Sequence, residues 1–276
     1  MPRRPTAATT TLACLALATC AARAEPPPEA GELPVFDVVE IGADGSNYRA
    51  SALNDHGTVV GQRGTVWTAP WRWQPGDEEV TVLPFLPEWK GGEGREAGNP
   101  VAMVRDINNE GVAVGSGGGD YEPERDPVLW DAEGAVQDLG DLPDAAREAG
   151  AAERITDDGT VYGWTLDAEG REVGFRWTED SGMEPYDGEI PEEEPGEMER
   201  RIRRFLADHE LGALVAPEAV PEFPVEEQFQ PGPDYFDDLR IQDINRAGQI
   251  VGWKKGLLGT QRSYLLTPRD NGATAR

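Results

Sequence analysis

Few residues in this sequence could carry catalytic chemistry. Only two histidines are present, His56 and His209, and the two cysteines, Cys14 and Cys20, both lie near the N-terminus. A Ser-His-Asp or Cys-His arrangement needs a histidine beside the nucleophile, and zinc sites need several His or Cys ligands. His56 falls in a predicted turn, and His209 lies near the end of a predicted helix, where a cation is favourable. We therefore predict no catalytic residue, no metal-ligating residue and no cofactor.

Carboxylates are the one abundant reactive group. The 276 residues include 52 acidic and 25 basic side chains, and the formal net charge is −27. Glycoside hydrolysis uses a pair of carboxylates, but nothing in the sequence singles out two of them. Three acidic segments, 131–134, 157–159 and 167–170, end in glycine; none has the calcium-loop spacing, so ordinary β-turns are the favoured interpretation. The negative charge argues against binding to nucleic acids or anionic membrane surfaces.

Eight tryptophans could either stack on sugars or form a core. Trp73, Trp130 and Trp177 recur at one position of an internal repeat, which favours packing between repeat units. Trp67 and Trp89 fall outside that pattern and are the better candidates for exposure. The residues that would bind a ligand stay unidentified at this stage.

An internal repeat positions these residues and covers most of the chain. Four segments, starting at residues 53, 107, 155 and 244, share one pattern: apolar, Asn or Thr, two variable residues, Gly, one variable residue, apolar, any residue, Gly. The pattern predicts a β-hairpin in which Asn or Thr bonds to the turn backbone and the first Gly adopts a positive φ angle. The residues assigned to this structural repeat are Asn54, Gly57, Gly61, Trp73, Asn108, Gly111, Gly115, Trp130, Gly159, Gly163, Trp177, Asn245, Gly248 and Gly252.

Two further strands are predicted after each hairpin, so that one module supplies about four strands. The first of them covers 71–73, 128–130, 175–177 and 264–266, and the second covers 80–83, 136–139 and 183–186. The fourth module lacks its last strand, and residues 35–42, just before the first hairpin, resemble the missing piece. An N-terminal strand that completes the last module is a way to close a ring of sheets without an open edge.

The spacing of the hairpins fits one propeller blade per module, since Gly57, Gly111 and Gly159 are 54 and 48 residues apart. The sequence thus predicts an all-β fold, a β-propeller-like ring of four modules closed by the N-terminal strand. An open β-sandwich with coincidental repeats is the alternative.

Between Gly159 and Gly248 the spacing grows to 89 residues, which leaves room for an acidic insertion at 187–238 with 16 acidic and 4 basic side chains. Its middle is predicted to be helical, with i, i+4 pairs of Glu197 with Arg201 and Glu199 with Arg203, and an end at Gly212. The apolar face of this helix is formed by Met198, Ile202, Phe205 and Leu206. A degenerate fifth module around residues 208–216 is the alternative to a purely helical insertion.

Residues 1–24 are typical of an export signal. Arg3 and Arg4 precede an uncharged stretch, and Ala22-Arg23-Ala24 is a small-x-small cleavage site. Cleavage removes three arginines and no acid, so 22 basic and 52 acidic residues remain, a net charge of −30. The alternative is a lipid on Cys20, because residues 17–20 resemble a lipobox. We assign residues 25–32 as a linker, 33–268 as the repeat domain and 269–276 as a polar tail.

The second module carries the clearest family resemblance. Residues 126–130 read Asp-Pro-Val-Leu-Trp and residues 138–140 read Asp-Leu-Gly. Together with the starter strand and hairpin of residues 33–83, this arrangement resembles the HAF-repeat family of bacterial extracellular repeat proteins. No module keeps the family's His-Ala pair, and Thr156 replaces Asn in the third hairpin. The resemblance implies a secreted or surface-exposed β-repeat protein without established enzymatic activity and without catalytic residues to assign.

We therefore expect a secreted, periplasmic or cell-surface protein that is not an enzyme. It would bind or scaffold an extracellular protein or polysaccharide as a monomer, without membrane insertion after signal cleavage. The alternative is an exported carbohydrate-active enzyme that uses carboxylates in the central channel.

Overall fold

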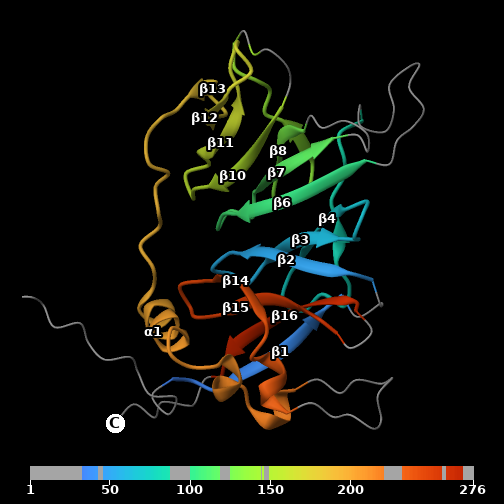
Figure 1. Cartoon of the computed structure of the whole chain (residues 1–276), viewed down its shortest axis with the longest axis vertical. Coiled ribbons are helices and arrows are strands. Elements are labelled where there is room, and N and C mark those ends of the chain that lie inside the picture. Colours follow the sequence, from blue (N-terminus) through green and yellow to red (C-terminus); the bar gives the residue numbers. More distant parts are fainter. Residues whose placement is uncertain are drawn as a thin grey trace, which may run out of the picture.

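The computed structural model describes residues 33–42, 46–87, 100–118, 125–143, 145, 149–220, 232–256 and 259–269. The predicted export signal with Cys14 and Cys20, the linker 25–32, Trp89 and residues 270–276 of the polar tail lie outside these residues. Within the described part, the chain is mostly β, with four antiparallel sheets of four strands each and one α-helix (Figure 1).

Each sheet corresponds to one predicted module. The first sheet contains β2 (Tyr48–Leu53), β3 (Val59–Arg63), β4 (Ala69–Trp73) and β5 (Thr81–Val82). The second contains β6 (Val101–Ile107), β7 (Ala113–Gly118), β8 (Asp126–Trp130) and β9 (Val136–Asp138). The third contains β10 (Gly150–Ile155), β11 (Val161–Leu166), β12 (Glu172–Thr178) and β13 (Gly182–Pro185). The fourth contains β14 (Arg240–Ile244), β15 (Ile250–Lys255), β16 (Gln261–Pro268) and the N-terminal β1 (Phe36–Ile41).

The N-terminal strand completes the fourth sheet, as predicted. β1 pairs antiparallel with β16 over its whole length, from Phe36 opposite Pro268 to Ile41 opposite Ser263. The first and last strands of the chain are therefore neighbours, and β16 has a partner on both sides.

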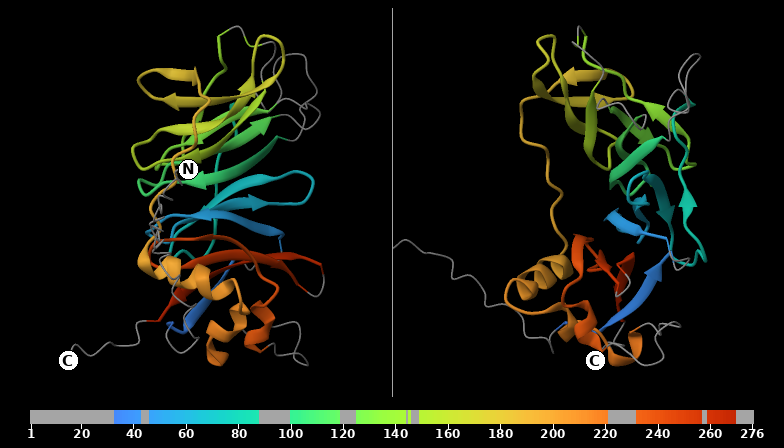
Figure 2. Two further views of the ribbon diagram at one scale, coloured as in Figure 1. Left: turned by 60° about the vertical axis from the view of Figure 1, so that its left-hand side comes forward. Right: turned by 45° about the vertical axis from the view of Figure 1, so that its right-hand side comes forward.

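The described residues do not form the predicted closed ring, however. The sheets follow one another in the order fourth, first, second, third, and the third and fourth lie at opposite ends of the molecule (Figure 1). The two further views show the same open arc, with residues 187–196 running along one side from β13 to α1 (Figure 2). We call residues 187–196 the crossing segment.

The insertion explains why the arc stays open. One face of the fourth sheet packs on the first sheet, and its other face is covered by α1 (Glu197–Leu206), η3 (Leu211–Leu214) and η5 (Pro233–Phe236). The short helix η4 (Pro217–Ala219) buries no residue. Ile202 and Phe205 of α1 are fully buried in one cluster with Tyr264 and Leu266 of β16. The insertion thus occupies the sheet face that a closed ring would pack against the third sheet.

Within the insertion, the helical prediction is confirmed and its end is corrected. Ile202 and Phe205 face the core, and the Nε atom of Arg203 lies 2.9 Å from Oε1 of Glu199. The helix ends at Leu206; Gly212 instead lies in η3, where its N–H donates to the Asp237 carboxylate. Residues 208–216 do not form a fifth sheet among the described residues, because their strand pairing is a single bridge between Val215 and Phe36.

At the other end of the arc, the third sheet turns a different kind of surface outward. Tyr162, Arg176 and Tyr186 stand where the second sheet has the aliphatic residues Val114, Leu129 and Leu139, which pack on the third sheet. The two tyrosine rings lie 5.1 Å apart, and Arg176 pairs with Glu184 at 2.8 Å. This end is therefore capped by polar side chains, as terminal units of repeat proteins are.

The recurring tryptophans form the cores between sheets, as predicted. Trp73 packs in the cluster that joins the fourth and first sheets, Trp130 joins the first and second, and Trp177 joins the second and third. Leu266 takes the equivalent place in the fourth module, where its neighbours come from the insertion. Trp67, outside the pattern, is 55% exposed.

Candidate functional site

The four hairpin turns have the predicted geometry. The first glycine of each motif, at positions 57, 111, 159 and 248, has a φ angle between +77° and +83°. The Asn54 side-chain oxygen accepts hydrogen bonds from the His56 and Thr58 amides, and Asn108 accepts from Val112 in the same way. Only glycine adopts this backbone conformation without strain, which explains its recurrence.

The second glycine of the motif recurs for a different reason, which the sequence alone did not reveal. A β-bulge interrupts the first strand of each sheet opposite this glycine. A Cβ atom on Gly115 would lie 2.0 Å from the Met103 carbonyl oxygen, and one on Gly61 would lie 2.1 Å from that of Arg49. Gly163 and Gly252 face backbone oxygens in the same way, so the bulge leaves room for no side chain.

The asparagine of the motif also joins neighbouring sheets. The Asn245 side-chain amide donates to the Asn54 carbonyl oxygen at 2.9 Å, Asn54 donates to the Asn108 carbonyl at 3.0 Å, and Asn108 donates to the Thr156 carbonyl at 3.2 Å. All three asparagines are buried. The chain of hydrogen bonds runs from the fourth sheet through the first and second to the third, where Thr156 ends it.

A second chain of hydrogen bonds runs through the next residue of each turn. The Arg246 amide donates to the Asp55 carboxylate at 2.9 Å, the Asp55 amide to the Asn109 side chain at 2.8 Å, and the Asn109 amide to the Asp157 carboxylate at 2.8 Å. Two aspartates from the ends of first strands add to it: Asp243 accepts from the Leu53 amide, and Asp106 accepts from the Ile155 amide.

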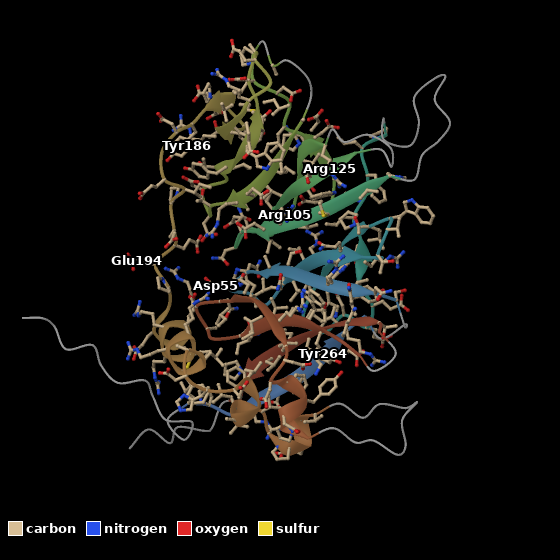
Figure 3. The ribbon with its side chains drawn as sticks, in the orientation of Figure 1. Asp55, Arg105, Arg125, Tyr186, Glu194 and Tyr264 are labelled. Carbon is tan, nitrogen blue, oxygen red and sulfur yellow. The ribbon has the colours of Figure 1, made fainter. Side chains whose placement is uncertain are left out.

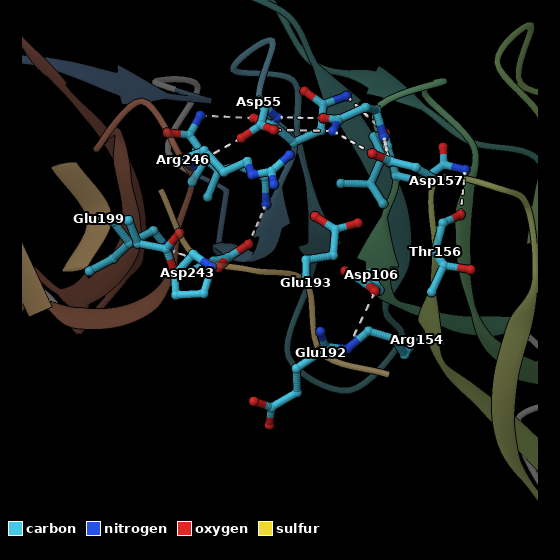
Figure 4. Close-up of a pocket in the computed structure, with 18 of the residues that line it drawn as sticks. Asp55, Asp106, Arg154, Thr156, Asp157, Glu192, Glu193, Glu199, Asp243 and Arg246 are labelled. Atoms are coloured by element: carbon cyan, nitrogen blue, oxygen red, sulfur yellow. Dashed lines mark hydrogen bonds and ion pairs between the residues drawn. The ribbon is translucent and has the colours of Figure 1, made fainter. Parts of the chain in front are cut away.

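These turns and the crossing segment enclose a cavity of 470 Å³. Its walls come from all four sheets at the ends of β2, β6, β10 and β14, and from residues 191–195 on the far side (Figure 4). Arg246 ties the two walls together, because its amide binds Asp55 and its Nε binds the Glu194 carbonyl at 3.2 Å. Figure 3 shows Asp55 and Glu194 on the same side of the arc.

The cavity is strongly acidic. Three arginines, Arg154, Arg203 and Arg246, face eight carboxylates, which belong to Asp55, Asp106, Asp157, Glu192, Glu193, Glu194, Glu199 and Asp243. Burial raises the pKa of Asp106 to about 6, although hydrogen bonds from the Ile155 and Ile107 amides and the charge of Arg154 oppose the shift. Burial also raises the pKa of Asp243 and, together with the charge of Asp157, that of Glu193.

The sequence-derived repeat residues are thus divided between cavity and core. Asn54, Asn108 and Asn245 meet at the cavity wall, whereas Trp73, Trp130 and Trp177 lie between the sheets. What sequence reasoning missed are the acceptors between modules and the crossing segment. Their signal is the recurrence of Asp or Asn after the motif asparagine, at Asp55, Asn109 and Asp157.

The residues considered for metal chemistry have other roles. His56 is exposed in its turn, and His209 places Nδ1 3.1 Å from the Phe205 carbonyl at the end of α1. Asp131, Asp158 and Asp167 accept hydrogen bonds from the amides of their own turns. In the part of the chain that the structure describes, no three His, Cys, Asp or Glu side chains cluster as metal ligands would. No helix among the described ranges is long and apolar enough to cross a membrane.

Comparison with known proteins places the chain in no family. No protein-family model matches the sequence, and no curated protein matches it. A solved structure of TolB from Acinetobacter baumannii is similar over 81% of this chain and 44% of its own, at 10% identity and a TM-score of 0.36. A mutant of AofleA from Arthrobotrys oligospora is similar over 84% of this chain and 57% of its own, at 11% identity and a TM-score of 0.30. The chain spans less than two thirds of either protein, and similarity at this level carries no argument about function.

Proposed function

We propose that this chain is an exported, non-enzymatic β-repeat protein that binds or scaffolds an extracellular protein or polysaccharide. Its modules would be propeller-type blades in an open arc, and the partner would enter the cavity between the turns and the crossing segment. One observation carries this proposal. Each of four aspartates in the cavity wall accepts a hydrogen bond from a backbone amide of a neighbouring module; they are Asp55, Asp106, Asp157 and Asp243.

Carboxylates in this role fix the position of one sheet against the next. Each of these carboxylates already accepts hydrogen bonds that hold the fold together, which suits a preformed binding surface better than a reaction centre. The excess of carboxylates over arginines repels anions, so the group of the partner that enters is neutral or cationic.

A pair of adjacent substitutions tests the cavity. Pro191 lines it, whereas Ile190, the preceding residue of the crossing segment, is 41% exposed and does not. The parent chain is first screened on an array of neutral and cationic peptides and glycans to find a partner. We expect Pro191→Trp to weaken the affinity for that partner by about tenfold. Ile190→Trp should leave that affinity unchanged. Equal binding by both variants and the parent chain would place the partner elsewhere.

Export is tested separately. Cell fractionation and N-terminal sequencing should find the mature protein outside the cytoplasm with Glu25 as its first residue. A diacylglyceryl group on Cys20 would establish the lipoprotein alternative, and an uncleaved chain found only in the cytoplasm would overturn export.

Enzymatic activity is the second candidate, and one observation favours it. Asp106, with its pKa raised to about 6, shares the cavity with Glu193, whose pKa is also raised. Carboxyl groups with raised pKa values serve as general acids in glycosidases. Turnover of a glycan panel that Glu193→Gln and Asp106→Asn both abolish would establish this candidate, and no turnover across the panel would reject it.

A further inference from the structure

Two arginines lie against one tryptophan at the ends of β2 and β14 remote from the hairpin turns. The guanidinium carbons of Arg49 and Arg240 lie 5.7 and 4.7 Å from the ring centroid of Trp253. Both arginines occupy the same position of the repeat, since their carbonyl oxygens face the second glycine of their own hairpins. The equivalent residues of the second and third sheets are Met103 and Ala151, so the pair belongs to the seam between the fourth and first sheets.

Among the described residues, these two arginines have no carboxylate partner, unlike several other arginines of this acidic chain. Arg176, Arg203 and Arg262 each pair with a glutamate. In the described ranges, neither Arg49 nor Arg240 has a carboxylate within ion-pair distance or a hydrogen bond from its guanidinium group. The arrangement is unexpected in a protein with 52 acidic and 25 basic residues.

Arg49 carries a sharper sign of a missing acceptor. Its Nε atom is shielded from solvent and has no hydrogen-bond partner, whereas its terminal nitrogens are not among the buried atoms. Buried donors are normally satisfied, so an unsatisfied one in a native structure is consistent with a water or an ion that accepts from it. Cation–π attraction to the Trp253 ring holds both guanidinium groups in place without using their N–H donors, and these donors match an oxyanion.

We propose that Arg49 and Arg240 form a binding site for a small ligand that carries an oxyanion group, a carboxylate, sulfate or phosphate. Planar guanidinium groups match the geometry of these groups and form charge-assisted hydrogen bonds with them. The ligand is small because the net charge of −27 repels a polyanion at every distance that salt does not screen. This site is separate from the acidic cavity and does not depend on the proposed function.

NMR of the 15N-labelled full chain tests the site. Sodium chloride is replaced at constant ionic strength by sodium sulfate, phosphate or succinate, and the indole N–H signal of Trp253 is followed after assignment with Trp253→Phe. We expect a saturable shift, and the anion that saturates at the lowest concentration distinguishes the three groups. Arg49→Gln and Arg240→Gln should each weaken this binding by about tenfold.

Two further variants keep the test decisive. Arg176→Gln makes the same change of charge on the third sheet and should bind as the parent chain does. Arg49→Lys keeps the charge but loses the planar fork, so its affinity should fall between those of Arg49→Gln and the parent chain. A Trp253 shift that grows linearly with the concentration of the test anion would mean an adventitious ion only and would overturn the proposal. Unchanged saturation in a folded double variant lacking both arginines would overturn it as well.

Discussion

The side-chain amide of Asn54 donates a 3.0 Å hydrogen bond to the carbonyl oxygen of Asn108, the residue at the same position of the next module. Because Asn108 does the same to Thr156, and Asn245 to Asn54, the motif asparagine both shapes its own turn and joins two sheets. The bond has a direction, from the fourth sheet towards the third.

The repeat pattern changes in the two sheets at the ends of this chain of hydrogen bonds. Thr156 replaces asparagine in the third sheet, the last of the arc, where no further sheet offers a carbonyl. Arg246 replaces Asp or Asn in the fourth sheet, the first of the arc, where no preceding sheet offers an amide. In a closed ring, the side chain of residue 156 would have to donate to the next sheet, whereas the Thr156 hydroxyl donates to the Thr160 carbonyl of its own turn. Residue 246 would have to be an acceptor, so both changes are consistent with the open arc.

Replacing the asparagine should therefore cost stability only inside the arc. In Asn108→Thr the hydroxyl can donate to the Val112 carbonyl, as Thr156 does to the Thr160 carbonyl, but the Val112 amide loses its acceptor and the bond to the next sheet is lost. We expect a decrease of about 1–2 kcal/mol in the free energy of unfolding, measured by urea denaturation. Thr156→Asn is the matched control and should change it by less than about 0.5 kcal/mol. Equal effects of the two variants would contradict the directional bond.

The two kinds of glycine should respond differently to alanine. Gly115→Ala places a Cβ atom 2.0 Å from the Met103 carbonyl oxygen and should destabilise the chain by about 3 kcal/mol or more, or prevent folding. Gly159, a first glycine of the motif, has a φ of +83° but open space around a Cβ, so Gly159→Ala should cost only about 1–2 kcal/mol. Thermal and urea unfolding of both variants would decide this, and a mild effect of Gly115→Ala would show that the bulge can shift.

The insertion should behave as part of the fold. Phe205→Ala removes a fully buried ring from the cluster that covers the fourth sheet and should cost about 3–5 kcal/mol. Hydrogen exchange of β14, β15 and β16 amides should accelerate before that of the third sheet. Leu206→Ala, at the partly buried neighbouring position, should have a smaller effect. Unchanged exchange in the fourth sheet would mean that the insertion is a detachable appendage.

The buried carboxyl of Asp106 should make stability depend on pH. Its pKa is about 6 in the folded chain, above the ordinary value of 3.8, so the folded state binds more protons between these values. Its contribution to the free energy of unfolding therefore falls as the pH rises through this window. The asparagine of Asp106→Asn cannot ionise. The stability of this variant relative to the parent chain should therefore rise between about pH 4 and pH 7.

Comparing the two chains at each pH largely cancels the contributions of Asp243 and Glu193, whose pKa values shift in the same direction. Urea denaturation at four pH values provides the measurement. A stability difference that does not vary with pH would show that the pKa of Asp106 is not raised in the folded chain.

Local features of the fold were predictable because they depend on residues close in sequence. The positive φ of Gly57 follows from its place in a short hairpin, and the buried face of α1 follows from the spacing of Ile202 and Phe205. Even the pairing of β1 with β16 was predictable, because residues 35–42 resemble the strand that the fourth module lacks. The end of α1 was wrong because Gly212 serves tertiary packing against Pro233 and Asp237.

The four modules, their hairpins, the tryptophan cores and the helical insertion are each encoded in a pattern a few residues long, so they could be predicted without the structure. Tertiary structure alone decided that the ring stays open, because that depends on which surface buries the free face of the fourth sheet. It also brought together the acidic cavity and the contacts of Arg49 and Arg240 with Trp253. Their members lie up to about two hundred residues apart, and only packing between sheets, driven by burial of apolar surface, brings them together.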